Sequence, residues 1–224
     1  MSGIVSGRAG ASGLEYDLTS PRGAGAGSTV MVLLHGRGSH KGDLQALGPV
    51  LPEDWVLVTP QAPYPGAEWG YGPGWAWYRY VAEDRVVEET LEASLAMLDD
   101  FLGELPEVLG FAPGRIVLGG FSQGGTSSLA YGLTRPGRIA AALNFSGFLP
   151  ASVDVPDGEV VGGVPPVFWG HGQSDPNIPF ALAIRGRDRL KGAGVPLVAM
   201  DYPIGHWMVP DEIHDAVAMI GTLP

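Results

Sequence analysis

The chain has 224 residues, of which 45% are apolar, and its 24 acidic residues against 13 basic ones give a formal net charge of −11. Its 35 glycines and 20 prolines are spread among apolar runs, so the composition favours one folded domain over residues 1–224 and argues against disorder. The acidic balance excludes a typical nucleic-acid binder, and the absence of cysteine excludes disulfides, thiolate metal sites and a cysteine nucleophile.

The N-terminal 28 residues contain one modest strand candidate, residues 14–18, and no apolar core of a signal peptide. The next segment, residues 29–34, is continuously apolar and rich in β-branched side chains. It is far shorter than the roughly 20 residues that span a membrane, so we expect a cytoplasmic protein without stable membrane insertion. The apolar, β-branched composition of residues 29–34 predicts a strand that is buried on both faces, as in a parallel sheet.

The rest of the chain alternates between short apolar runs and amphipathic patterns. The clearest helix covers residues 86–105, where leucines and valines recur at helical spacing, and we expect it to end at Pro106. The alternation predicts an α/β fold, with a mostly parallel central sheet covered by helices on both faces. The other predicted elements are helices over 123–133, 180–190 and 211–220, and strands over 55–58, 115–118, 139–145, 167–169 and 195–202.

Residues 60–80 form a different kind of segment, because seven of the chain's twenty aromatic residues fall there without helical spacing. We expect a long, structured loop that borders the functional site, and no separate cap domain. Trp75, Trp77 and Tyr78 are candidates for the wall of an apolar pocket, with packing of each ring onto the core as an equal alternative. Phe148 follows the predicted strand 139–145 and is a candidate for the same pocket.

A possible nucleophile follows the predicted strand 115–118, in the pattern Gly120-Phe-Ser122-Gln-Gly124. A chain that reverses sharply from strand to helix leaves no room for side chains two residues either side of the serine, and it projects the serine hydroxyl outward. A plain glycine-rich turn is the alternative. The pattern occurs once, at the strand–turn–helix junction that the mechanism requires, which favours Ser122 as a nucleophile.

A serine hydroxyl needs a base, and five histidines are available. His206 lies in a loop after the last predicted strand and downstream of the serine, which makes it the leading candidate. His35 and His171 follow strands at the same edge of the sheet. His40, in a loop, and His214, on the last helix, are expected to be exposed.

The base in turn needs an acidic partner that holds its tautomer. Asp175 lies in a proline-flanked loop just after a predicted strand. Asp201 falls within the last strand, where a structural role is expected, and Asp154 lies in a turn rich in proline and glycine. The chain order Ser122, Asp175, His206 is the serine–acid–histidine order of α/β-hydrolases.

Acyl transfer also requires N–H donors for the developing oxyanion. The backbone amide of Gln123, at the predicted helix start, can supply one donor. The loop His35-Gly-Arg37-Gly follows an early strand, so the amide of Arg37 can supply the second. A plain glycine turn with a solvated guanidinium is the alternative for Arg37.

Four motifs in this order resemble the phospholipase/carboxylesterase family of small α/β-hydrolases, which includes acyl-protein thioesterases. The resemblance covers roughly residues 29–210 and implies hydrolysis of carboxylic esters or thioesters without a cofactor or metal. The motifs are Leu34-His-Gly-x-Gly, Gly120-Phe-Ser-Gln-Gly-Gly, His171-Gly-x-x-Asp-Pro and Gly205-His-x-Met.

By motif match, the resemblance implies Ser122 as nucleophile, Asp175 and His206 as the other members of a catalytic triad, and the amides of Arg37 and Gln123 as the oxyanion hole. Members of this family often form dimers, so a homodimer is one candidate assembly.

Two departures from the family pattern concern the substrate pocket. Asn177 interrupts the apolar residues that tend to follow the acid, before Ile178, which is a further candidate for substrate binding. Residues 77–79 read Trp-Tyr-Arg where relatives often have Trp-Phe-Asp. Both differences bear on substrate choice.

The sequence therefore predicts a serine carboxylesterase that acts on small-molecule esters with small to medium acyl chains. Acyl-protein thioesterase and lysophospholipase activities use the same residues and stay open. A catalytically inactive hydrolase fold that only binds ligands is the alternative from another class. A nucleotide-binding protein is excluded because no G-x-G-x-x-G or P-loop motif occurs. A metal hydrolase is disfavoured because H-E-x-x-H is absent, and an exposed helix surface explains the acidic residues and histidine of 211–215.

Overall fold

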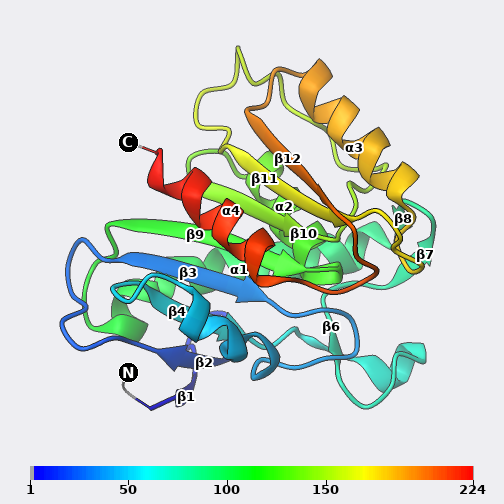
Figure 1. The fold of residues 1–224 in the computed structure, drawn as a ribbon. Helices are drawn as coiled ribbons and strands as arrows, with labels where there is room; N and C mark the ends of the chain where they lie inside the picture. Colours follow the sequence, from blue (N-terminus) through cyan, green and yellow to red (C-terminus); the bar gives the residue numbers. More distant parts are fainter. Residues whose placement is uncertain (1–2, 224) are drawn as a thin grey trace.

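The computed structural model describes residues 3–223, so residues 1, 2 and 224 of the predicted domain lie outside it. In the described part, eight strands form one sheet in the order β1-β2-β4-β3-β9-β10-β11-β12 (Figure 1). Neighbours from β4 to β12 run parallel, and β1 and β2 add an antiparallel edge. The strands are β1 (Val5–Arg8), β2 (Glu15–Thr19), β3 (Thr29–Leu34), β4 (Val56–Pro60), β9 (Arg115–Phe121), β10 (Ala141–Phe145), β11 (Val167–Gly172) and β12 (Leu197–Tyr202).

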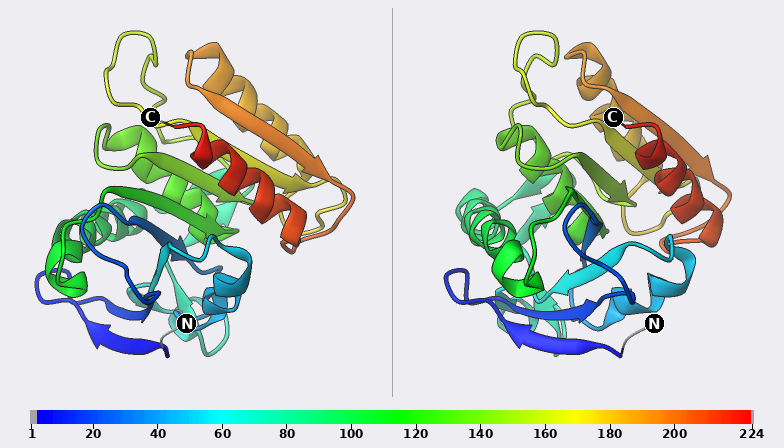
Figure 2. Two further views of the ribbon diagram at one scale, coloured as in Figure 1. Left: turned by 60° about the vertical axis from the view of Figure 1, so that its left-hand side comes forward. Right: turned by 90° about the vertical axis from the view of Figure 1, so that its left-hand side faces the viewer.

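Helices cover both faces of this sheet (Figure 2). Side chains alternate along each strand, so in β3 Val30 and Val32 face the core under α1, α2 and α3, while Met31 and Leu33 face the core under α4 and η1. The predicted α/β class with two covered faces is confirmed. The helices are α1 (Glu88–Leu109), α2 (Gln123–Thr134), α3 (Phe180–Gly192), α4 (Pro210–Gly221) and the 3-10 helix η1 (Asp43–Val50).

The predicted strands and helices occur within a few residues of their expected bounds, with one error. Helix α1 does not end at Pro106 but continues to Leu109, and Gly110 closes it in the left-handed conformation (φ 76°). Proline removes one backbone hydrogen bond, yet the buried Leu102 and Leu105 before it and the half-buried Leu109 after it keep the helix packed on the core.

The aromatic segment is the loop that the sequence predicts, with short paired pieces inside it. The pieces β5 (Tyr64–Pro65) and β6 (Trp75–Ala76) pair with each other, and η2 (Gly66–Trp69) lies between them. The next pair, β7 (Tyr80–Ala82) and β8 (Arg85–Val86), leads into α1. Strand β1 and helix η1 were not predicted.

The topology decides where a site can form. Strands β3, β9, β10, β11 and β12 are all parallel, so their carboxyl ends meet at one edge of the sheet, where α/β folds place their ligands. Strand β4 is parallel to β3, so the aromatic loop that follows it, with Trp75, Trp77 and Tyr78, also leaves this edge. The other loops and turns at this edge carry the candidates Arg37, Ser122, Gln123, Phe148, Asp175, Ile178 and His206.

Within residues 3–223, no helix is both long enough and apolar enough to cross a membrane.

Candidate active site

Ser122 occupies a strained turn between β9 and α2. Its backbone has φ 54° and ψ −114°, a conformation that non-glycine residues rarely adopt. A Cβ on Gly120 would lie 2.5 Å from the carbonyl carbon of Gly124, and a Cβ on Gly124 would lie 2.0 Å from the Leu34 carbonyl oxygen. Both glycines are therefore needed for this reversal, as expected for a nucleophile elbow.

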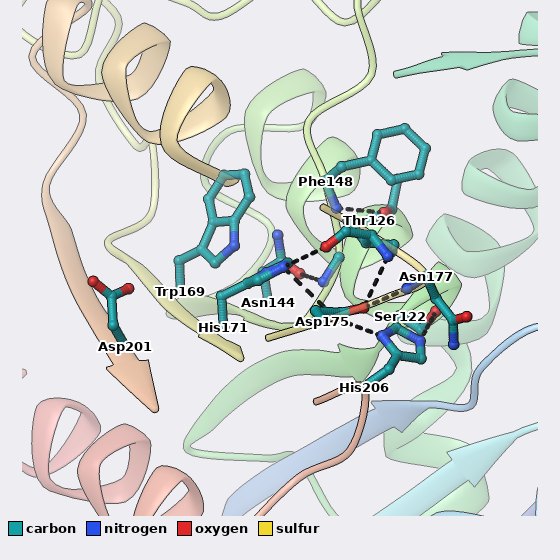
Figure 3. Close-up of polar contacts among 12 residues, drawn as sticks. Ser122, Thr126, Asn144, Phe148, Trp169, His171, Asp175, Asn177, Asp201 and His206 are labelled. Carbon is teal, nitrogen blue, oxygen red and sulfur yellow. Dashed lines mark hydrogen bonds and ion pairs between the residues drawn. The ribbon is translucent and has the colours of Figure 1, made fainter. Parts of the chain in front are cut away.

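Three side chains meet above this turn (Figure 3). The Nε2 atom of His206 lies 2.9 Å from the Ser122 hydroxyl oxygen, and its Nδ1 lies 2.6 Å from Oδ2 of Asp175. Asp175 comes from the loop after β11, and His206 comes from the loop between β12 and α4. The ring of Phe121 packs against the His206 ring, with their centroids 4.7 Å apart.

The Asp175 carboxylate is enclosed and well supplied with donors. Its Oδ1 accepts hydrogen bonds from the backbone amides of Asn177 and Ile178, each at 2.8 Å. Burial by itself raises the pKa of Asp175, but the hydrogen bonds from His206 and from these amides outweigh it and hold the pKa below its ordinary value. The carboxylate is therefore ionised at neutral pH and can accept the His206 Nδ1–H.

The competing acids lie elsewhere. Asp201 stands apart from the triad in Figure 3 and binds Arg187, with 2.5 Å between its Oδ1 and the guanidinium Nη1. Arg187 also donates to the backbone carbonyls of Trp169 and Met200, at 2.9 and 3.0 Å. Asp154 is exposed. The structural role expected for Asp201 agrees with this placement.

The other histidines do not reach the serine. The buried His35 ring accepts a hydrogen bond from the Ala62 amide at Nε2 (3.1 Å), and its Nδ1 lies 2.8 Å from the Gly36 carbonyl oxygen. Burial lowers the pKa of His35 to about 4, so its ring is neutral and fixes the start of the aromatic loop. His40 and His214 are exposed, as expected.

A pocket of about 240 Å³ opens beside Ser122 and His206. Its wall combines apolar and polar side chains from several loops. The predicted residues that line it are Arg37, Tyr78, Gln123, Phe148 and Ile178.

The other two aromatic candidates, Trp75 and Trp77, do not line this pocket. The Trp77 ring is fully buried in the core, and its indole N–H donates to the His35 carbonyl at 3.0 Å. Trp75 pairs through its backbone with Ser39, 2.8 Å from amide nitrogen to carbonyl oxygen. For these two rings, packing of the loop onto the body of the protein replaces the expected contact with substrate.

Two contributions to the pocket were not predicted from the sequence, the side-chain contacts of Gln123 and the presence of Leu182. The side chain of Gln123 accepts a hydrogen bond from the Trp77 amide and donates one to the Tyr78 carbonyl, both at 2.7 Å. Leu182 lines the pocket from the first turn of α3. No local pattern signals these contacts, because Gln123 is more than 40 residues from its partners along the chain.

One further expectation was wrong. Glu212 does not belong to an exposed helix surface, because α4 packs it against β11, and its side chain is fully buried. A Cβ on Gly170 would lie 2.0 Å from Oε1 of Glu212, so this glycine makes room for the carboxyl group. Burial raises the pKa of Glu212 to about 8.

A parallel sheet covered on both faces, with a serine in this kind of turn at its carboxyl edge, defines an α/β-hydrolase. The chain belongs to the phospholipase/carboxylesterase family, whose model matches residues 21–223. The family and the fold predicted from the sequence are thereby confirmed.

Individual relatives agree with this assignment. The chain is 36% identical to acyl-protein thioesterase 1 of Gibberella zeae over 115 residues, which cover 50% of this chain and 49% of the relative. It is 29% identical to acyl-protein thioesterase 1 of Mycosarcoma maydis over 235 residues, covering 92% and 96% of the two chains. The crystal structure of esterase PE8 resembles it with a TM-score of 0.75 and 28% identity, over 92% of this chain and 97% of that one.

With the acyl-protein thioesterase of Gibberella zeae and two further fungal thioesterases of the same name, the chain matches only about half of the relative's length. The names of the relatives and of the family support the predicted class, an ester-cleaving hydrolase.

Proposed function

We propose that the protein hydrolyses carboxylic esters of small to medium acyl chains through an acyl-enzyme intermediate. The observation that carries this proposal is the unbroken line of hydrogen-bonding groups from the Ser122 hydroxyl through His206 to the enclosed Asp175 carboxylate, with distances of 2.9 and 2.6 Å. A serine, a base within reach of its proton and an acid that orients the base are the parts that nucleophilic acyl transfer requires.

In the proposed reaction, the Ser122 oxygen forms a bond to the ester carbonyl carbon while His206 Nε2 takes the hydroxyl proton. The tetrahedral intermediate collapses as His206 returns the proton to the leaving alcohol oxygen, which leaves an acyl group on Ser122. A water molecule then gives a proton to His206 and attacks the acyl carbon, and the carboxylic acid departs when the proton returns to Ser122. Asp175 stabilises the imidazolium at both stages.

The oxyanion of each tetrahedral stage needs donors beside Ser122. Among the described residues, neither the Arg37 amide nor the Gln123 amide has a hydrogen-bond acceptor within the protein. Both residues line the pocket, and a Cβ on Gly36 would lie 3.7 Å from the Ser122 Cβ, so the Arg37 loop runs beside the nucleophile. Two unpaired amides at this position support their assignment as the oxyanion hole.

The size of the pocket supports a short or medium acyl group. The pocket volume of about 240 Å³ is smaller than the roughly 300–1,000 Å³ of pockets that enclose drug-sized ligands. The net charge of −11 offers no attraction to anionic membrane surfaces, so the proposed substrate is a small-molecule ester. The cytoplasmic location and the homodimer stay predictions from the sequence.

Acyl-protein thioesterase activity is the second candidate, since the relative from Mycosarcoma maydis that bears this name is similar over nearly the whole chain. It would use the same residues on a longer acyl chain. Hydrolysis of a palmitoyl thioester at a rate above that of short esters would favour it.

The test is hydrolysis of p-nitrophenyl esters from acetate to laurate, with the wild type beside Ser122→Ala. We expect the variant to lose turnover while its circular dichroism spectrum stays native, because the change removes one oxygen from an otherwise intact turn. Unchanged turnover in the variant would contradict the mechanism. A folded wild type without turnover, and without labelling of Ser122 by a fluorophosphonate, would favour the inactive binding protein.

A further inference from the structure

One buried histidine beside the triad takes no part in the proposed proton transfers. His171 is the second-last residue of β11, four residues before Asp175, and its side chain is completely enclosed. Its Nε2 lies 2.9 Å from the Ile178 carbonyl oxygen and 3.7 Å from Oδ2 of Asp175 (Figure 3). The ring thus lies beside the carboxylate of Asp175, near the same oxygen that faces His206.

The partners of His171 define its tautomer. A carbonyl oxygen only accepts, so Nε2 must carry the proton that points at Ile178. Among the described residues, the buried Nδ1 has no hydrogen-bond partner. Burial lowers the pKa of His171, with Ile178 and Asp175 opposing this in part and Arg187 and His206 adding to it. A neutral ring here leaves the charge of Asp175 available to His206.

Ile178 connects this histidine to two parts of the site. Its amide donates to Oδ1 of Asp175 at 2.8 Å, its carbonyl accepts from His171, and its side chain lines the pocket. A displacement of Ile178 would therefore move the acid and one wall of the pocket together.

We propose that His171 is a positioning residue, which holds the Ile178 carbonyl through its Nε2–H and thereby fixes both the Asp175 carboxylate and the Ile178 wall of the pocket. The proposal rests on the proposed function, because the role of Asp175 does. His171 is the first residue of the His171-Gly-x-x-Asp-Pro motif and lies outside the triad, and in this proposal it positions the acid of the triad.

The decisive comparison is His171→Gln against His171→Met. The two replacements have similar length and volume, but only glutamine keeps an N–H donor near the place of Nε2. With p-nitrophenyl butyrate, we expect kcat/KM to fall roughly 100-fold in the methionine variant, the order of loss that a small misplacement of a catalytic group causes. The glutamine variant should recover most of that loss.

A merely structural role would not change the ionisation of the base. A loosened Asp175 stabilises the His206 imidazolium less, so the acidic limb of the kcat/KM profile should move to lower pH in His171→Met and stay in place in His171→Gln. Because Ile178 lines the pocket, the preference between acetate and laurate esters should change in the methionine variant as well. Urea unfolding of each variant corrects these rates for any loss of folded protein.

Two measurements do not depend on turnover. The ¹⁵N shifts of His171 in the wild type report its tautomer, and an Nδ1–H tautomer would overturn the proposal even if the methionine variant did not fold. An NMR titration of the His206 ring reports its pKa without substrate. Equal His206 pKa values in the wild type and the folded methionine variant, or equal activities of the two variants, would also overturn it. If the wild type hydrolyses no ester, that result contradicts the proposed function but not the role of His171, because neither NMR measurement requires turnover.

Discussion

At the scale of single residues, the environment of Asp175 distinguishes it from Asp201, the competing acid on the last strand. Two backbone amides and one imidazole supply three donors to its enclosed carboxylate. Asp201, by contrast, pairs with a guanidinium, and its side chain is about one-third exposed (38%). The first arrangement fits the proposed role of orienting a base, while the second joins α3 to the edge strand β12.

We therefore expect Asp175→Asn to lower kcat about 10⁴-fold. The asparagine NH₂ group can take the place of Oδ2 and donate to Nδ1 of His206, which favours the tautomer with its proton on Nε2, and that tautomer cannot accept the serine proton. The variant should keep some turnover above the uncatalysed rate. The measurement is kcat on p-nitrophenyl butyrate at saturating substrate.

Asp201→Asn is the matched control for this substitution. It weakens the pair with Arg187, so it should reduce the free energy of unfolding and leave kcat within a few-fold of the wild type. A larger loss of kcat in Asp201→Asn than in Asp175→Asn would contradict the assignment of the acid.

At the scale of elements, the side chain of Gln123 links the start of α2 to the aromatic loop. Its amide group bonds one backbone N–H and one backbone C=O on successive residues, Trp77 and Tyr78. All three residues are buried, so the two backbone groups have no access to water. The same contact sets the position of Tyr78, a wall of the pocket, relative to Ser122.

Replacement of Gln123 by methionine should leave those two backbone groups unpaired. We expect the free energy of unfolding in urea to fall by about 1–3 kcal/mol for each group, and KM for p-nitrophenyl esters to rise as Tyr78 moves. Gln45→Met is a matched control, because Gln45 is also buried and bonds the Asp17 carbonyl and Thr59, away from the pocket. It should lose stability without a change in KM; an equal rise in KM would contradict the role of Gln123.

The packing of α4 on β11 predicts a dependence of stability on pH. Burial raises the pKa of Glu212 to about 8, from an ordinary value of 4.5. Between these values the folded chain keeps a proton that the unfolded chain has lost, so the free energy of unfolding falls as pH rises, by up to about 1.4 kcal/mol per pH unit.

Glu212→Gln removes this ionisation and keeps the shape of the protonated acid. We expect the variant to gain stability over the wild type progressively between pH 5 and pH 8, as measured by urea unfolding. A difference between the two proteins that stays constant over this range would show that Glu212 is ionised in the folded state.

At the scale of the whole molecule, the pocket exists only because distant segments converge. Arg37 follows β3, Tyr78 comes from the aromatic loop, Phe148 follows β10, and Leu182 comes from α3. Parallel strands bring these segments to one edge of the sheet, where a pocket of about 240 Å³ lies between them.

Leu182→Ala should enlarge this pocket and move the preference toward longer acyl chains. Each methylene of substrate that gains contact adds about 0.8 kcal/mol, so kcat/KM for laurate relative to butyrate should rise roughly fourfold per methylene. Leu190→Ala, on the same helix but buried outside the pocket, should destabilise the protein without changing this ratio. An unchanged ratio in Leu182→Ala would mean that the acyl chain lies elsewhere.

Properties that depend on neighbours along the chain could be predicted from the amino-acid sequence. Apolar runs and helical spacing predicted the order of strands and helices, and the steric demands of a strand-to-helix reversal predicted the turn at Ser122. Parallel topology then predicted that Asp175 and His206 would lie at the same edge as the serine, and in the structure both lie within hydrogen-bonding distance of their partners.

The direction in which each side chain faces could not be predicted in this way, because it depends on segments that are distant in sequence and meet in the fold. Trp77 packs into the core because the His35 carbonyl accepts its indole N–H, whereas its neighbour Tyr78 lines the pocket. Glu212 is buried because α4 closes over Gly170, and α1 continues past Pro106 because its leucines pack on the sheet. Each outcome depends on partners tens of residues away, and local propensity carries no information about such partners.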